Sequence, residues 1–138
     1  MTIKFPSQEW VEKYIDKINE NEAYAKAAKN WEGDFLFVME PDGNLQEEVT
    51  LYIDLWHGKA RSGYLVTPEN PAPDKVAYTY SGKYTNWLKL LNKEIDPIKG
   101  LMQRKFKLKG NMAKVLRAVK AAQELVNTTT HIEDVEFL

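Results

Sequence analysis

Few side chains of the types used in catalysis stand out in this chain, and their spacing does not assemble a reaction site. There are two histidines, His57 in a predicted turn and His131 near the end of the chain. His131-x-Glu133-Asp134 offers ligands that could hold a metal weakly, but no packed element is predicted around them. Because catalysis needs an acid, a base and oxyanion donors held together, the sequence predicts no catalytic residue and no metal site.

The serines, glycines and cysteines lead to the same conclusion. Ser7, Ser62 and Ser81 lie in no nucleophile-elbow pattern, and no glycine-rich phosphate loop is present. The chain has no cysteine, which excludes disulfides, thiolate chemistry and cysteine-based metal sites. We therefore expect no cofactor and a non-enzymatic protein. The absence of cysteine, of a signal-peptide pattern and of a long apolar run favours a cytoplasmic location.

The elements that would position these side chains follow from hydrophobic spacing. Ser7 is a suitable N-cap for a first helix, and Asn21 can cap a short second helix. Residues 35–39 are apolar at odd and even positions alike, which is typical of a strand covered on both faces. Residues 49–56 alternate apolar and polar side chains as a half-buried strand does, and a hairpin turn at 57–59 leads into a strand over 60–66.

The second half of the chain continues with strands at 76–81 and 104–109, separated by short helices. Asp96-Pro97 is typical of a helix start, and a final helix is expected from Met112 to about Val126. This order predicts an α+β fold, a five-stranded, mostly antiparallel sheet with helices on one face. We expect one domain over residues 1–127 and a loose acidic tail over 128–138.

Charge is distributed unevenly, although the net charge of the chain is only −1. Residues 83–120 contain eleven Lys and Arg side chains against two acidic ones, so this segment is strongly positive. Lys105, Lys107 and Lys109 alternate on one predicted strand, where lysines discourage strand pairing between molecules. The basic 99–117 region also suits transient contact with an anionic membrane. Nucleic acid is not expected, because the neighbouring aromatic side chains point inward and cannot stack on bases.

The stretch WLKLLNKEIDPIKGLMQRKFKLKGNM, residues 87–112, resembles the sterol carrier protein-2 (SCP-2) family in its D-P-x₇-K-x-K-x-x-G-N-M pattern. The strand and turn at 52–59 and the strand at 76–79 are similar too, so the likeness covers roughly residues 5–126. Two positions depart from the family pattern. Arg104 stands where many members have glycine, and Asn92-Lys93 where Thr-Gly is common.

The resemblance implies an apolar tunnel between sheet and helices, and with it the binding and transfer of a lipid such as a fatty acid. Spacing alone favours a solid core, because the same apolar pattern is expected whether or not a ligand is held. The side chains that would line the tunnel are Phe35, Phe37, Leu51, Ile53, Leu55, Trp87, Leu88, Leu91, Ile98, Leu101, Met102, Val115, Leu116 and Val119. We expect its mouth near residues 87–103 and the final helix, where Arg104 or Lys83 would pair with a carboxylate headgroup.

A different function remains open on the opposite face of the sheet. Tyr52, Trp56, Tyr78 and Tyr80 are expected there, which would make that face unusually apolar. Either long side chains cover it, or it is a homodimer or partner interface. The alternative to lipid carriage is therefore a protein–protein interaction or enzyme-accessory module on the same fold.

Overall fold

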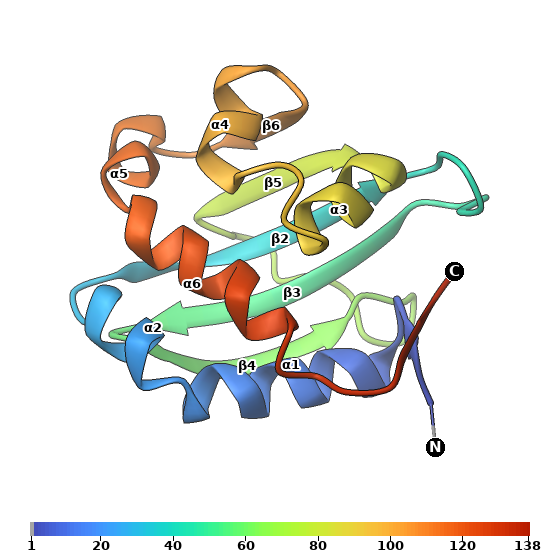
Figure 1. Ribbon diagram of the computed structural model, residues 1–138, viewed down its shortest axis with the longest axis horizontal. Helices are drawn as coiled ribbons and strands as arrows, with labels where there is room; N and C mark the ends of the chain where they lie inside the picture. Colours follow the sequence, from blue (N-terminus) through green and yellow to red (C-terminus); the bar gives the residue numbers. More distant parts are fainter. Residues whose placement is uncertain (1) are drawn as a thin grey trace.

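A five-stranded sheet forms one wall of the structure, a computed structural model that describes residues 2–138. The strand order is β4-β3-β2-β5-β6, and only the β2–β5 pair is parallel (Figure 1). The predicted α+β class and the mostly antiparallel sheet are confirmed. The strands are β2 (Glu32–Glu40), β3 (Val49–Trp56), β4 (Lys59–Leu65), β5 (Tyr78–Lys83) and β6 (Phe106–Lys109).

Six helices cover one face of this sheet (Figure 1). Their N-caps are local: Ser7 accepts a hydrogen bond from the Trp10 N–H, Asn21 caps α2, and Asp96 accepts from the N–H groups of Ile98 and Lys99. The helices are α1 (Gln8–Glu20), α2 (Glu22–Ala27), α3 (Tyr84–Leu91), α4 (Pro97–Met102), α5 (Met112–Arg117) and α6 (Val119–Thr129). No helix of residues 2–138 is long and apolar enough to span a membrane.

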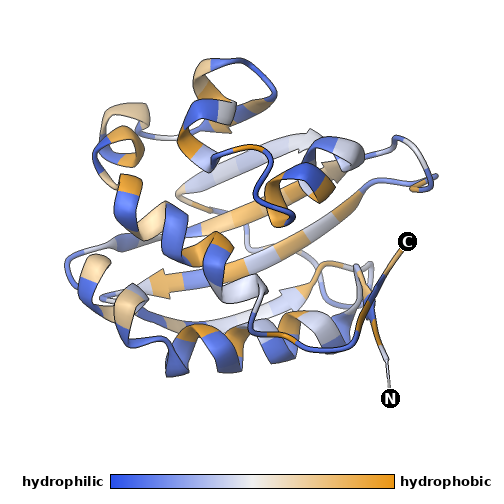
Figure 2. Cartoon of the chain, viewed as in Figure 1, coloured by the Kyte–Doolittle hydropathy of each residue, from blue (hydrophilic) through white to orange (hydrophobic). Residues whose placement is uncertain are grey.

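Strand register sets which side chains face the helices. Phe35 lies between Ile53 and Tyr78, and Phe37 lies opposite Tyr80 on the parallel side. Tyr78 and Tyr80 are therefore buried on the inner face, and their predicted outward orientation is wrong. A tyrosine can turn inward here because its hydroxyl finds a partner: that of Tyr80 donates to the Pro97 carbonyl at 2.8 Å. Figure 2 shows the apolar strands β2 and β3 behind the helices.

The predicted single final helix is wrong, since it divides into α5 and α6. Ala118 leaves the helical region with φ −99° and ψ 39°, and its N–H bonds to the carbonyl of Val115, three residues back. The break changes the direction of the chain, so the apolar stripe expected along one straight helix is not continuous. Val115 on α5 is buried, while Leu116 and Val119 on either side of the break are exposed.

The C-terminal segment is ordered, and the expectation of a loose tail is wrong. Residues Val135–Phe137 form β7, which pairs in parallel with β1 (Ile3–Phe5). Thr128 is fully buried and accepts a hydrogen bond from the Asn21 side chain at 2.8 Å, and Ile132 is buried as well. Three-residue strands are too short to show a period in the sequence, and their pairing joins opposite ends of the chain.

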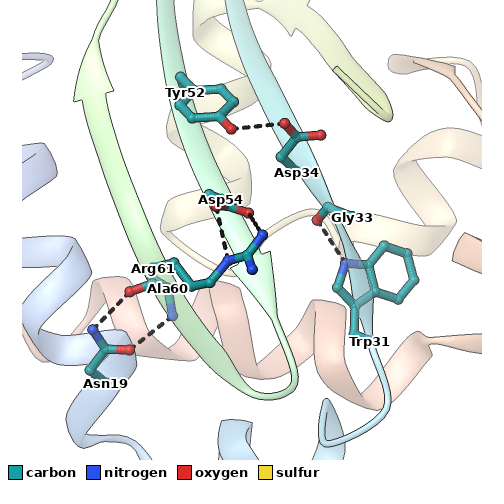
Figure 3. Close-up of polar contacts among 8 residues, drawn as sticks. All are labelled: Asn19, Trp31, Gly33, Asp34, Tyr52, Asp54, Ala60 and Arg61. Atoms are coloured by element: carbon teal, nitrogen blue, oxygen red, sulfur yellow. Dashed lines mark hydrogen bonds and ion pairs between the residues drawn. The ribbon is translucent and has the colours of Figure 1, made fainter. Parts of the chain in front are cut away.

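The two edges of the large sheet are finished differently. At β4, the Asn19 side chain accepts from the Ala60 N–H at 2.8 Å and donates to the Ala60 carbonyl at 3.0 Å (Figure 3). The Gln8 side chain accepts from the Leu65 N–H in the same way. Side-chain amides from α1 thus take the place of a neighbouring strand. At β6 the edge has no such cover and carries the exposed Lys107 and Lys109.

Candidate ligand-binding site

An apolar cavity of about 90 Å³ lies between the inner face of the sheet and the helical layer. Phe35, Phe37 and Leu51 line it from the sheet. From the helices, its wall includes Trp87, Ile98 and Val115. A second hollow of about 40 Å³ shares Phe35, Val115, Ala122 and Leu125 with the first. The two hollows are therefore neighbours under the same part of the helical layer.

The hydroxyl groups along the wall of the larger cavity, and the Trp87 indole N–H, are bonded within the protein. The Tyr14 hydroxyl donates to the Leu125 carbonyl at 2.8 Å, and the Trp87 indole N–H donates to the Val38 carbonyl at 2.9 Å. Tyr80 donates to Pro97, and the Thr129 hydroxyl to the Val126 carbonyl. No buried side-chain nitrogen or oxygen of the described residues lacks a partner. The hydroxyl groups of the wall are therefore occupied by protein carbonyls.

The two cavity tyrosines stay protonated for a physical reason. Burial raises the pKa of Tyr14 above the usual range of a phenol, and the nearby Tyr24 adds to this shift. Burial likewise raises the pKa of Tyr80, with the Asp96 carboxylate contributing. A phenol with a raised pKa is a poor general base at neutral pH. The cavity thus combines apolar surface with two inert hydroxyls.

The structure brings half of the predicted tunnel residues to the larger cavity and disperses the others. Leu55 lines the smaller hollow, and Leu88 borders a shallow depression beside Phe137. Ile53 and Leu101 are buried without lining either hollow, whereas Met102, Leu116 and Val119 are exposed. Those at the larger cavity are Phe35, Phe37, Leu51, Trp87, Leu91, Ile98 and Val115.

Several side chains that line the larger cavity were not among the predicted site residues. Trp10 and Tyr14, which are four residues apart on α1, line the cavity from that helix. Their spacing on an apolar helix face was a usable signal. Tyr80 was missed because its strand face was assigned wrongly. The other missed residues are Phe5, Met39, Leu90, Pro97, Ala122, Leu125, Val126 and Thr129.

Charged side chains gather instead on the outer face of the sheet, away from the cavity. Asp34 accepts from the Tyr52 hydroxyl at 2.8 Å, and Asp54 binds the Arg61 guanidinium at 3.0 and 3.2 Å (Figure 3). The His57 Nε2 atom lies 2.6 Å from a carboxylate oxygen of Glu32, within hydrogen-bond distance. These groups satisfy one another, and within residues 2–138 no cluster of three or more His, Cys, Asp or Glu side chains could hold a metal.

Comparison with known proteins assigns the family. The chain matches the SCP-2 sterol transfer family over residues 11–123. It belongs to that family. The fold and the family of this SCP-2 protein imply binding and transfer of a lipid or sterol. A search of curated proteins found no match.

Solved structures agree with the family assignment. A crystal structure of sterol carrier protein 2 is 30% identical, with a TM-score of 0.81, and the match covers 91% of this chain and 97% of the other. A conserved hypothetical protein of Thermus thermophilus, described as a candidate sterol carrier protein, is also 30% identical. Its TM-score is 0.80, and the match covers 91% of this chain and 87% of that one. Palmitated SCP2L2 from Aedes aegypti shares the fold at 16% identity and a TM-score of 0.52, over 81% of this chain and 93% of the other.

The backbone conformation explains why glycine is common in the family at the two positions where this SCP-2 chain departs from the pattern. Lys93 has φ 63° and Arg104 has φ 61°, both in the left-handed region that favours glycine. Glycine fits these turns without a steric cost, whereas a side chain costs about 1–2 kcal/mol there. Both positions carry exposed basic side chains in this protein.

Proposed function

We propose that this SCP-2 protein binds the hydrocarbon chain of a fatty acid or similar lipid between sheet and helices, and transfers it without changing it chemically. The observation that supports this proposal most strongly is the cavity wall, which is apolar and has its hydroxyl groups bonded to protein carbonyls. Such a wall holds a hydrocarbon by burial alone and needs no specific polar constellation. It also offers no acid, base or nucleophile to a bound molecule.

The size of the cavity requires movement on binding. Sites for small molecules enclose about 300–1,000 Å³, whereas the larger hollow here measures about 90 Å³. The sheet wall is held by continuous strand pairing, so the helical layer is the part that can yield. Leu91, Leu125 and Val126 on that side are only half-buried. We infer that α3 and α6 move outward to admit a chain.

Burial of a hydrocarbon provides enough free energy for such movement. Each CH₂ removed from water contributes about 0.8 kcal/mol, so a tail of about 16 carbons gains on the order of 12 kcal/mol. Ordering of the ligand and displacement of side chains offset part of this gain. The palmitated mosquito relative, which shares the fold, supports a fatty acyl chain as the ligand class.

Filling the cavity tests the proposal directly. In Ala122→Phe, a phenyl ring would occupy the space shared by the two hollows. We expect the affinity for a fluorescent fatty acid, measured by titration, to fall at least tenfold while the folded structure is kept. Ala23→Phe, at an exposed position of α2, is the matched control and should bind as the unmodified chain does. Equal affinity in all three proteins would contradict the proposal.

Native mass spectrometry of gently purified protein gives an independent test. A stoichiometric lipid adduct would identify the ligand class after extraction. An adduct-free protein that also ignores added fatty acids would overturn lipid carriage and favour the interaction-module alternative. The same spectrum tests the predicted homodimer through the mass of the intact species. We also propose that the protein is cytoplasmic. We further propose that its 99–117 region makes transient contact with an anionic membrane.

A further inference from the structure

We propose that the corner formed by α4, β6 and α5 docks on an anionic lipid bilayer, with the exposed apolar face of α5 inserted among the lipids. This inference rests on the proposed lipid-carrying function and names the surface through which ligand is exchanged. The three elements gather at one end of the molecule, away from the end where β1 and β7 pair (Figure 1).

The corner carries an excess of positive charge. Residues 99–120 contain eight basic side chains and no acidic one. Seven of the eight are exposed, and none forms an ion pair within residues 2–138. One of the eight is Arg104, which stands at a position whose backbone lies in the left-handed region that favours glycine. Anionic lipid headgroups attract such a surface, at about 1 kcal/mol or about fivefold in affinity for each Lys or Arg.

The same segment exposes large apolar side chains. Met102 is 72% exposed, Met112 41%, Leu116 39% and Val119 38%. Met112 and Leu116 are four residues apart on α5 and therefore share one helix face. Apolar side chains surrounded by lysines and arginines are the pattern of helices that lie in a membrane interface. Figure 2 shows this alternation of hydrophobic and hydrophilic residues along α5 and α6.

Helix α5 also connects this surface to the cavity. Its Val115 lines both hollows, while Met112 and Leu116 face solvent. Within residues 2–138, no other helix or strand packs extensively on α5. Lys114 attaches it to the start of β2, since its ammonium donates to the Glu32 carbonyl at 2.8 Å and lies 4.9 Å from the Trp31 ring centre. A bilayer that takes up Met112 and Leu116 would draw Val115 away from the cavity wall.

A bilayer fits these observations better than nucleic acid does. The aromatic side chain of β6, Phe106, is buried against Tyr80 and Trp87, so it cannot stack on bases. The exposed side chains beside the lysines are methionine, leucine and valine, which gain from contact with acyl chains. Both features favour a lipid surface over a nucleic acid.

Vesicle binding by the full chain tests the inference. We expect sedimentation with phosphatidylcholine–phosphatidylserine vesicles, little with pure phosphatidylcholine, and weakening as salt rises. In the triple variant Lys107→Glu, Lys109→Glu, Arg117→Glu, affinity should fall about a hundredfold or more. The matched control is Lys13→Glu, Lys26→Glu, Lys75→Glu, which changes net charge equally at exposed positions outside the corner. Equal loss in both variants would overturn the inference.

Insertion of α5 is tested separately with a unique label, because the chain has no native cysteine. An environment-sensitive fluorophore on Met112→Cys should shift to the blue on anionic vesicles, and one on Lys75→Cys should not. An unshifted spectrum at position 112 in vesicle-bound protein would overturn insertion. Fatty acid binding in solution is measured in parallel. Binding of fatty acid without binding of vesicles would sink only the docking surface, and the reverse would sink the carrier function.

Discussion

The two halves of the interior differ in how tightly they are packed. Between α1 and the sheet, the side chains of Val11, Ile18 and Ile53 are completely buried. Gly63 on β4 allows this close approach, because a Cβ there would come within 2.7 Å of the Ile15 side chain. Beneath α3 and α6, by contrast, a cavity remains, and the half-buried Leu91, Leu125 and Val126 form part of its wall. We infer that the first half maintains the fold and that the second half is the one that would yield to the proposed ligand.

Truncating one side chain in each half tests whether the two halves differ in packing. Ile53→Ala should lower the free energy of unfolding by about 2–5 kcal/mol, since it leaves a void in close-packed surroundings. Leu125→Ala, on the cavity wall, should lose only about 1 kcal/mol but change the affinity for a fatty acid. Urea unfolding measures the first quantity and fluorescence titration the second. Equal losses of stability would mean that the helical half is ordinary core.

The Asp96 carboxylate provides a second test of the comparison, because it connects α4 and α6 on the cavity side of the interior. It caps α4 and accepts from the Gln123 side chain on α6 at 2.9 Å. Partial burial raises the pKa of Asp96, but the hydrogen bonds from Lys99, Gln123 and Ile98 outweigh it, so the net pKa is lowered. Asp96→Ala should therefore reduce stability by about 1–2 kcal/mol at neutral pH.

The same group predicts a pH dependence with a definite sign. Because the folded pKa of Asp96 lies below its unfolded value, its contribution is present above the ordinary aspartate pKa of about 3.9 and disappears as pH falls through the folded pKa. Asp96→Asn keeps a capping side chain without a titrating group. Urea midpoints between neutral and acidic pH should fall less steeply for this variant than for the unmodified chain. Parallel curves would contradict the assignment.

The smallest expected effect concerns the turn after α3. Lys93→Gly removes a side chain from a left-handed position, where an L-residue costs about 1–2 kcal/mol, at an entropic cost of about 0.5–1 kcal/mol. Stability should rise by about 0.5–1 kcal/mol, measured by thermal unfolding. Lys89→Gly, in the interior of α3, is the control and should destabilise the protein. A loss of stability in Lys93→Gly would contradict the argument from backbone conformation.

Local signals in the sequence were the most reliable. The caps at Ser7, Asn21 and Asp96 depend on bonds within three residues, and all three are confirmed. The inward orientation of Tyr78 and Tyr80 depends on a parallel neighbour far along the chain, and spacing within the strand did not show it.

The candidate site was predicted less well than the fold for a related reason. Met102, Leu116 and Val119 fit a helical repeat of apolar residues, yet all three are exposed. Leu116 and Val119 lie on either side of the helix break at Ala118. Periodicity identifies apolar faces but does not show which of them another element covers. Nor does it distinguish a filled core from one with a hollow, because both require the same residue types.

The parallel β2–β5 pair has a consequence for how the chain folds. Strands β2, β3 and β4 follow one another directly in the chain and can pair soon after collapse, whereas Asp34 and its partner Ala77 are 43 residues apart. Closing so long a loop delays contact formation. We therefore expect the β2–β4 meander to form first and the part of the cavity wall built by Tyr80 of β5 and by Trp87 to form last. Pulsed hydrogen exchange during refolding would show this order as late protection of β5 and β6, and simultaneous protection would contradict it.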